Sequence, residues 1–269
     1  MTTDRRDFLK SSATIAAGAA AGSCASSAKE GRPHRWIDRE KCIACGQCVT
    51  VCPMGAITLR EKSEVDPDEC AECGTCWRSR VCPVDAIMNG ELTYPRVLRA
   101  VFSDPLAEHE DTGVRGRGTE GIKTNDAIER FGRGKMGVFV ELGRPALGAR
   151  LRDAELVVKK FKSRGYDVIK ENPVHGLIAD HNTGDMKPEV LDQKVISCLV
   201  EFVLPESAAA DLLAMAEELS NEVESVFNLS VALRARPDGS SPLYELFPSD
   251  TFSLPNGKVN IGLSEGIAG

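Results

Sequence analysis

The sequence has few aromatic residues, no excess of basic residues and no long apolar segment. Aromatic side chains make up 5% of the 269 residues, which disfavours a ligand site built by stacking alone. Acidic residues outnumber basic ones by 40 to 33, and the net charge of -7 argues against nucleic acid as the principal partner. No uncharged apolar run reaches the roughly 18 residues of a membrane span, so no transmembrane helix is expected in the mature chain.

Cysteine, by contrast, is abundant, with ten residues. Eight of them lie between Cys42 and Cys82, and the other two are Cys24 and Cys198. The eight form two runs, C-x2-C-x2-C-x3-C-P and C-x2-C-x2-C-x5-C-P. A secreted disulfide framework typically distributes its cysteines along a short chain. The regular spacing found here indicates metal ligands instead.

The two runs repeat one pattern, with an offset of 28 residues from Cys42 to Cys70. Three cysteines at positions i, i+3 and i+6 of a tight turn can direct three thiolates at three corners of one cube. Over about residues 34–92 the pattern resembles the bacterial-type ferredoxin module, which binds two [4Fe-4S] clusters. A zinc ribbon fits less well, because it pairs C-x2-C motifs without cysteine triplets or Cys-Pro pairs.

The resemblance also implies which cysteines bind each cluster. In that family the fourth cysteine of each run binds the cluster of the other run. Two ligand sets follow: Cys42, Cys45, Cys48 and Cys82 for the first cluster, and Cys70, Cys73, Cys76 and Cys52 for the second. The second run has two additional residues before its last cysteine but keeps all four ligands.

Residues 1–30 resemble a twin-arginine export signal. Arg5 and Arg6 precede a Phe-Leu-Lys segment, and an Ala-rich, weakly apolar stretch follows at residues 11–22. We therefore expect a periplasmic protein, or one on the exported face of the cytoplasmic membrane. Cys24 ends the apolar stretch in a sequence that loosely resembles a lipobox, so lipidation there, or a partner, would hold the protein at a membrane surface.

Residues 93–134 are predicted to be a Gly/Arg-rich linker or docking loop. Its basic residues include Arg115, Arg117 and Lys123, which would dock a partner or an anion on this acidic chain. Residues 116–121 match G-x-G-x-x-G, but no strand precedes them and the helix that follows is too short for a dinucleotide site.

Residues 135–236 are predicted to form a second domain, followed by a C-terminal extension at 237–269. Hydrophobic periodicity predicts helices at 147–161 and 207–227. It predicts strands at 136–142, 166–170, 177–179, 194–204 and 229–233. The β-α-β-β-α-β order is typical of the ferredoxin-like sandwich, so the chain is assigned to the α+β class, with the cluster module followed by this domain.

Few polar residues of the second domain suggest chemistry. In strand 194–204 the residues at 196, 198, 200, 202 and 204 are apolar, so Cys198 is expected in the core. His175, Asp180, His181 and Asp185 match no metal template and are interpreted as solvated loop residues. No nucleophile or paired-carboxylate signature is identifiable, which favours a binding or docking role for this domain.

Together these features predict an exported electron-transfer protein, more plausibly non-catalytic than an enzyme. It would be the small redox subunit of a flavin- or molybdenum-containing oxidoreductase. One alternative is a stand-alone reductase whose C-terminal domain binds the substrate or an organic cofactor. Another is a sensor or structural use of the clusters, although one cluster would suffice to stabilise a domain.

The export signal is testable by replacing both arginines. Arg5→Lys combined with Arg6→Lys should trap the protein in the cytoplasm with its iron bound, because twin-arginine substrates cross the membrane already folded. Immunoblots of periplasmic and cytoplasmic fractions measure the distribution. Normal periplasmic delivery of the double variant would show that this segment is not a twin-arginine signal.

Overall fold

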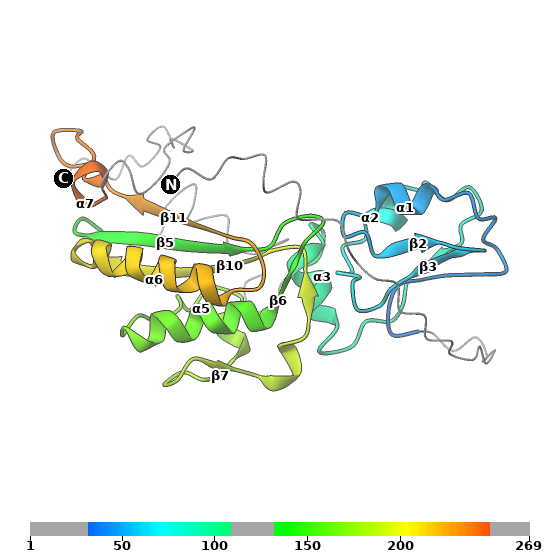
Figure 1. Ribbon diagram of the computed structural model, residues 1–269, viewed down its shortest axis with the longest axis horizontal. Helices are drawn as coiled ribbons and strands as arrows, with labels where there is room; N and C mark the ends of the chain where they lie inside the picture. Colours follow the sequence, from blue (N-terminus) through cyan, green and yellow to red (C-terminus); the bar gives the residue numbers. More distant parts are fainter. Residues whose placement is uncertain (1–31, 109–131, 248–269) are drawn as a thin grey trace. The chain divides into compact units, whose positions relative to one another are not determined.

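The computed structural model describes residues 32–108 and 132–247, which belong to one compact unit beginning at Arg32 (Figure 1). The expected export signal with Cys24, the three basic residues of the glycine-rich loop and residues 248–269 lie outside these ranges. In the described ranges, no helix combines the length and apolar character that a membrane crossing requires.

The cysteine module consists of short elements that repeat. They are β1 (Trp36–Ile37), α1 (Gln47–Val51), β2 (Ile57–Leu59), β3 (Ser63–Val65), α2 (Thr75–Arg78) and β4 (Ile87–Met88) (Figure 1). Strand β1 pairs antiparallel with β4, and β2 pairs antiparallel with β3. α3 (Val97–Ser103) follows the module. The two cysteine runs therefore have matching local structures, each with a short helix and a short strand after its first turn.

The module has a small core that includes its own cysteines. Cys42, Cys48 and Cys76 are buried together with Ile37 and Ile57. A core of this size buries little apolar surface, and domains of this length commonly depend on bound metal for stability.

The C-terminal part is built on one antiparallel sheet. Its elements are β5 (Lys135–Leu142), β6 (Ala149–Arg150), α5 (Leu151–Ser163), η2 (His175–Leu177), β7 (Ile178–Asp180), β8 (Asp185–Met186), η3 (Pro188–Val190), β9 (Lys194–Val195), β10 (Cys198–Pro205), η4 (Glu206–Ala208), α6 (Ala209–Glu222), β11 (Phe227–Leu233) and α7 (Leu243–Leu246). The sheet has the order β10-β5-β11, with both pairs antiparallel. This mixture of helices and strands is compatible with the α+β class.

The expected second strand at 166–170 is reduced to a single bridge. Val168 pairs antiparallel with Phe202 on the edge of β10 that β5 does not occupy. The N–H of Ile169 donates to the carbonyl of Glu201 on β10 as part of this bridge, whereas the N–H of Tyr166 donates to the carbonyl of Phe161 at the end of α5. This sheet thus has three full strands and one bridge where the β-α-β-β-α-β pattern predicts four strands.

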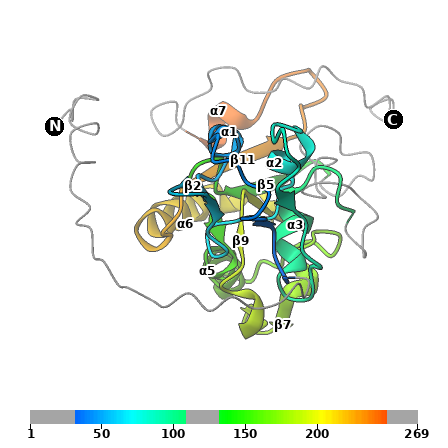
Figure 2. The ribbon, with the colours of Figure 1, turned by 90° about the vertical axis from the view of Figure 1, so that its right-hand side faces the viewer.

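Helices α5 and α6 cover the same face of the sheet (Figures 1 and 2). The alternation predicted for 194–204 is confirmed for β10, whose core-facing residues are Cys198, Val200, Phe202 and Leu204. The ring of Phe161 on α5 stacks on that of Phe202, with centroids 3.9 Å apart. Burying such a side chain stabilises the fold by about 1.5–3 kcal/mol.

Three predicted boundaries are wrong. α5 begins at Leu151 rather than 147, and Leu147 is 52% exposed, because Gly148 adopts a positive φ that interrupts the chain just before the helix. α6 ends at Glu222 rather than 227, since Phe227 begins β11. The strand predicted at 194–204 is divided into β9 and β10.

The division between β9 and β10 brings residue 196 to the cysteine module. Ile196 packs against the cluster of Met54, Ala56 and Ala71, and its N–H donates to Ser103 Oγ at 2.9 Å. A second backbone contact joins the N–H of Ala146 to the carbonyl of Pro53, at 2.6 Å. The segment after the first cysteine run is therefore packed against residues 146–148 and 196.

Gly148 tests this packing. It has a φ of +64, and a Cβ there would lie 2.6 Å from Met54 Cε and 2.7 Å from the carbonyl oxygen of Val195. Gly165 also has a positive φ, of +85, but open space around it. Gly165→Ala should cost about 1–2 kcal/mol from backbone strain alone, and Gly148→Ala about 1–3 kcal/mol more from overpacking. Denaturant unfolding of both variants measures the difference, and equal losses would contradict the close contact.

Candidate metal centre

Two left-handed turns shape the cysteine triplets. In the first, Ala44 has φ 59 and Gly46 has φ 74; in the second, Glu72 has φ 54 and Gly74 has φ 75. The two turns are related by the same 28-residue offset as the cysteines. Left-handed φ is unfavourable for residues with a Cβ, so its occurrence at Ala44 and Glu72 shows that the turn geometry overrides local preference.

The turns direct backbone N–H groups at sulfur. The N–H of Ala44 lies 3.4 Å from Cys42 Sγ, and the N–H of Ala86 lies 3.1 Å from Cys82 Sγ. In the second turn the N–H of Glu72 also bonds Cys70. Such donors stabilise a thiolate and, in iron–sulfur sites, influence the reduction potential.

The eight predicted ligands differ in exposure. Cys42, Cys48, Cys73 and Cys76 are buried, Cys52, Cys70 and Cys82 are half-buried, and Cys45 is exposed. All are free thiols, without a disulfide among them. Solvent therefore reaches the first triplet from the side of the module on which Cys45 lies.

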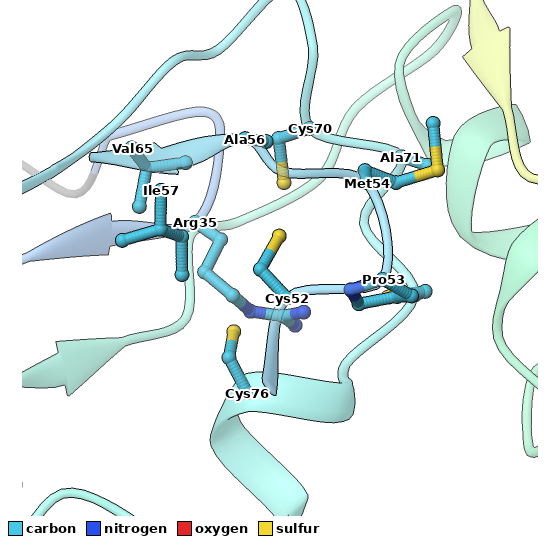
Figure 3. Close-up of a pocket in the computed structure, with 11 residues that line it drawn as sticks. Arg35, Cys52, Pro53, Met54, Ala56, Ile57, Val65, Cys70, Ala71 and Cys76 are labelled. Atoms are coloured by element: carbon cyan, nitrogen blue, oxygen red, sulfur yellow. The ribbon is translucent and has the colours of Figure 1, made fainter. Parts of the chain in front are cut away.

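The second predicted ligand set surrounds a cavity. Cys70, Cys73 and Cys76 line it together with Cys52, the last cysteine of the first run (Figure 3). The cavity encloses about 320 Å³ of non-atom space, including its opening to solvent. Its remaining walls are mainly apolar, among them Met54, Ile57 and Val65, with the side chain of Arg35 as the charged exception. These four thiols are the ones that the ferredoxin resemblance assigns to one cluster.

The first predicted set is gathered around the core of the module. Cys42, Cys45 and Cys48 interact electrostatically, and Cys82 packs against the buried cluster that contains Cys42 and Cys48. Ser63 on β3 hydrogen-bonds with the thiols of both Cys42 and Cys48.

Burial disfavours the ionisation of two thiols of the second set. Burial raises the pKa of Cys70 to about 12, assisted by the nearby carboxylate of Glu72, and it raises the pKa of Cys76 to about 11. In the first set, burial also raises the pKa of Cys48. Cys42 differs: burial opposes its ionisation, but hydrogen bonds from Ser63 and Ala44 outweigh burial, so its pKa is lowered. Most of these thiols therefore need a cation beside them to act as thiolates.

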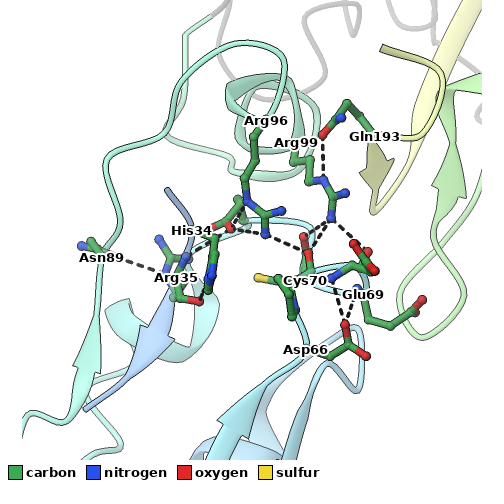
Figure 4. Close-up of polar contacts among 12 residues, drawn as sticks. His34, Arg35, Asp66, Glu69, Cys70, Asn89, Arg96, Arg99 and Gln193 are labelled. Atoms are coloured by element: carbon green, nitrogen blue, oxygen red, sulfur yellow. Dashed lines mark hydrogen bonds and ion pairs between the residues drawn. The ribbon is translucent and has the colours of Figure 1, made fainter. Parts of the chain in front are cut away.

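A network of charged residues surrounds the second turn (Figure 4). Oε1 of Glu72 accepts from the backbone N–H of Arg35 at 3.2 Å and from Arg96 Nη2 at 2.7 Å. Oε2 of Glu72 is buried and has no hydrogen-bond partner among the described residues. The guanidinium of Arg35 donates to Asn89 Oδ1 at 3.1 Å.

Arg99 on α3 hydrogen-bonds the backbone that leads into the second cysteine turn. Its Nη1 donates to the carbonyls of Pro67, Asp68 and Cys70, each at 2.9 Å, and its Nε donates to Gln193 Oε1 at 2.9 Å (Figure 4). The residue is 4% exposed. Arg99 thus fixes the backbone that carries Cys70 and links it to the segment before β9.

The residues fit a cubane cluster. Such a cluster binds one thiolate at each of four irons, so its ligands need to surround a cavity, whereas zinc binds four sulfurs at about 2.3 Å from a single ion. Within residues 32–108 and 132–247, no three His, Cys, Asp or Glu side chains are grouped as ligands of one metal ion. Four thiols around a mainly apolar cavity, with N–H groups directed at sulfur, match the cluster.

The other sequence candidates lie away from the cysteine triplets. Cys198 is 1% exposed in the core of the C-terminal part, as expected. His175 and His181 are adjacent, with ring centroids 4.5 Å apart, and burial lowers the pKa of His175. Asp185 pairs with Lys159 instead of approaching the two histidines as a ligand. Arg115, Arg117 and Lys123 lie outside the described residues.

Comparison with known proteins agrees with this site. Residues 35–58 match the family described as the 4Fe-4S binding domain. The matched segment contains the whole first cysteine run, from Cys42 to Cys52. No curated protein matches the chain. The chain therefore carries a ferredoxin-type iron–sulfur module with a [4Fe-4S] cluster and an electron-transfer role.

Three residues beside the thiols were missed by the sequence analysis. Arg35, Ser63 and Glu72 are buried polar residues in the module, and none belongs to the cysteine pattern. The repeat holds a signal that could have identified two of them: the 28-residue offset that relates Cys42 to Cys70 also relates Arg35 to Ser63. Glu72 could not be recognised, because the equivalent position of the first run is Ala44 and nothing in the pattern marks a buried carboxylate there.

Proposed function

We propose that this protein is an exported electron carrier with two [4Fe-4S] clusters, serving as the small redox subunit of a larger oxidoreductase. The observation that carries the proposal is the cavity lined by Cys52 together with Cys70, Cys73 and Cys76. It joins the last cysteine of the first run to the triplet of the second, which is the exchange that the ferredoxin resemblance implies. The matched family segment independently supports a cluster at the first triplet.

The ligand sets follow from this exchange. Cys52 would complete the set at the second triplet, which leaves Cys82 for the set of Cys42, Cys45 and Cys48. Cys82 packs against the buried core of the module that contains Cys42 and Cys48, although Cys76 and Cys52 belong to the same surroundings, so the assignment of Cys82 rests on the resemblance. A bound [4Fe-4S] cluster supplies a centre that accepts or donates one electron at a time.

The chain's own residues create the environment for that centre. Mainly apolar walls surround the second set, and backbone N–H groups bond the sulfurs of Cys42 and Cys82 in the first set and of Cys70 in the second. Because burial raises the pKa of Cys70 and Cys76, these thiols depend on iron for their ionisation, and a metal-bound thiol is deprotonated outright.

Electrons would be exchanged with a partner at the first triplet. Cys45 is exposed, and two large apolar residues near it are also exposed: Ile43 at 58% and Leu59 at 45%. Leu59 lies against the same turn, since a Cβ on Gly46 would be 3.2 Å from Leu59 Cδ2. An apolar surface beside a reachable ligand suits transient docking of a redox protein.

The export and the partner rest on the sequence. Residues 1–30 support periplasmic delivery, and Cys24 would allow a lipid anchor. The partner is proposed to be a flavin- or molybdenum-containing catalytic subunit, which supplies the substrate chemistry. In this arrangement the described part of the chain transfers electrons, and the partner carries out the reaction.

Iron analysis tests the cluster content and the ligand exchange. The protein purified without oxygen should contain about eight irons and eight sulfides, because two sets of four thiols each hold one [4Fe-4S] cluster. Cys52→Ser should alter the spectrum of the cluster at Cys70, Cys73 and Cys76, while Cys198→Ala, the buried control, should leave iron content unchanged. Four irons in the intact protein, or zinc in their place, would refute the two-cluster proposal.

The docking surface is tested with the partner that co-purifies from membranes or periplasm. That partner should contain flavin or molybdenum. Ile43→Glu with Leu59→Glu should lower the second-order rate of electron transfer at least about tenfold, because burial of each apolar side chain contributes about 1.5–3 kcal/mol. Leu147→Glu, at a residue of similar exposure in the C-terminal part, is the control. Stopped-flow absorbance measures the rate, and an unchanged rate in the double variant would place docking elsewhere.

A further inference from the structure

Two buried residues occupy equivalent positions in the repeat but differ in charge. Arg35 precedes β1 and Ser63 begins β3, and the 28-residue offset of the cysteine runs relates one to the other. Arg35 is 7% exposed and Ser63 is 1% exposed. The repeat therefore places a guanidinium at one position and a hydroxyl at the other.

Each of these residues faces a different set of thiols. Ser63 hydrogen-bonds with Cys42 and Cys48, which belong to the first ligand set. Arg35 lines the cavity of the second set, and its guanidinium lies among Cys52, Cys70 and Cys76 (Figure 3). Its positive charge favours the thiolates of Cys70 and Cys76, although burial outweighs this effect and their pKa values are raised.

The charge of Arg35 is held in place without an ion pair. Its Nε donates to the neutral side chain of Asn89, at 3.1 Å, and no carboxylate forms an ion pair with it in the part of the chain that the structure describes. The nearby carboxylate of Glu72 pairs with Arg96 instead. Arg35, Arg96 and Glu72 together leave a net positive charge beside the second set.

The first set has a weaker cationic neighbour. Lys62 Nζ donates to the carbonyl of Cys42 at 2.5 Å, but the residue is only half-buried. Solvent and salt screen such a charge far more than a guanidinium buried beside a cavity. The second set has two buried cations: Arg99 bonds the carbonyl of Cys70 from outside the cavity, whereas Arg35 is the charged side chain that lines the cavity itself.

We propose that Arg35 gives the cluster site of Cys52, Cys70, Cys73 and Cys76 a higher reduction potential than the site of Cys42, Cys45, Cys48 and Cys82. Uptake of one electron adds one unit of negative charge to a cluster, and a buried cation stabilises that charge. An electron received from a one-electron donor at the exposed Cys45 would then reside mainly on the cluster of the second set. The inference rests on the proposed function, since it requires two clusters.

The experiment is a dithionite redox titration of the full-length protein, followed by electron paramagnetic resonance. The wild-type protein should show two midpoints. Arg35→Gln should lower the upper midpoint and leave the lower one in place, reducing the equilibrium constant between the sites about tenfold, which is about 59 mV for one electron. Arg35→Lys should retain most of the wild-type separation, and Arg39→Gln, at an exposed residue, should change neither midpoint.

A second variant, Glu72→Gln, should shift the upper midpoint potential in the opposite direction. Glu72→Gln removes the negative charge beside the same cavity and should raise the upper midpoint, while its amide oxygen can still accept from Arg35 and Arg96. Iron and sulfide are measured on every sample. If Arg35→Gln loses iron, Arg35→Lys and Glu72→Gln decide the question through their midpoints.

The outcomes separate this inference from the proposed function. Eight irons with an upper midpoint that moves neither in Arg35→Gln nor in Glu72→Gln, or with shifts confined to the lower midpoint, would overturn the role of Arg35 alone. Four irons in the wild-type protein would refute the two-cluster proposal, and this inference with it.

Discussion

A thiol that is withdrawn from water resists ionisation, and this constraint governs the organisation of the cysteine module. Iron binds the thiolate, yet burial raises the pKa of Cys70 and Cys76 far above the pH at which a cell works. The chain reduces the cost with N–H donors, the Ser63 hydroxyl and the Arg35 guanidinium, and iron supplies the remainder. Because the core of the module is small and includes its cysteines, binding of metal and folding are closely coupled.

The repeat produces two similar turns, but their surroundings make the two halves different. The first turn presents Cys45 and Ile43 to solvent, whereas the second is enclosed by charged residues and lies near Ile196 of the C-terminal part. A protein that transfers electrons in one direction needs such a difference, since two identical sites would not favour either one. The asymmetry arises outside the cysteine pattern, in residues that the repeat leaves free to vary.

Much of this site could be predicted from the sequence because cysteine spacing reflects ligand geometry directly. The spacing predicted the triplet of Cys70, Cys73 and Cys76, and the ferredoxin resemblance added Cys52 from the other run; all four line the same cavity. The alternation in β10 likewise predicted which residues face the core. The ligand assignments of both sets and the export signal remain predictions.

Other features depend on tertiary contacts that a sequence does not display. The strand expected at 166–170 is reduced to one bridge at Val168 on β10, and the N–H of Tyr166 bonds the end of α5 instead of extending the ladder. Residue 196 continues the apolar alternation but packs against Met54, since the chain bends there toward the module. Arg35 has no signature of its own, and only its position in the repeat and its burial reveal a role.

The contacts of Arg99 have a consequence for how this chain can change over generations. One guanidinium holds three carbonyls of the segment leading to Cys70 and, through Gln193, the segment before β9. A substitution in the C-terminal part that displaced Gln193 would therefore be transmitted to the backbone of a metal ligand. The cysteine module and the C-terminal part are thus constrained together: a ferredoxin module without an arginine at this position would lack the bonds that join the backbone of Cys70 to Gln193.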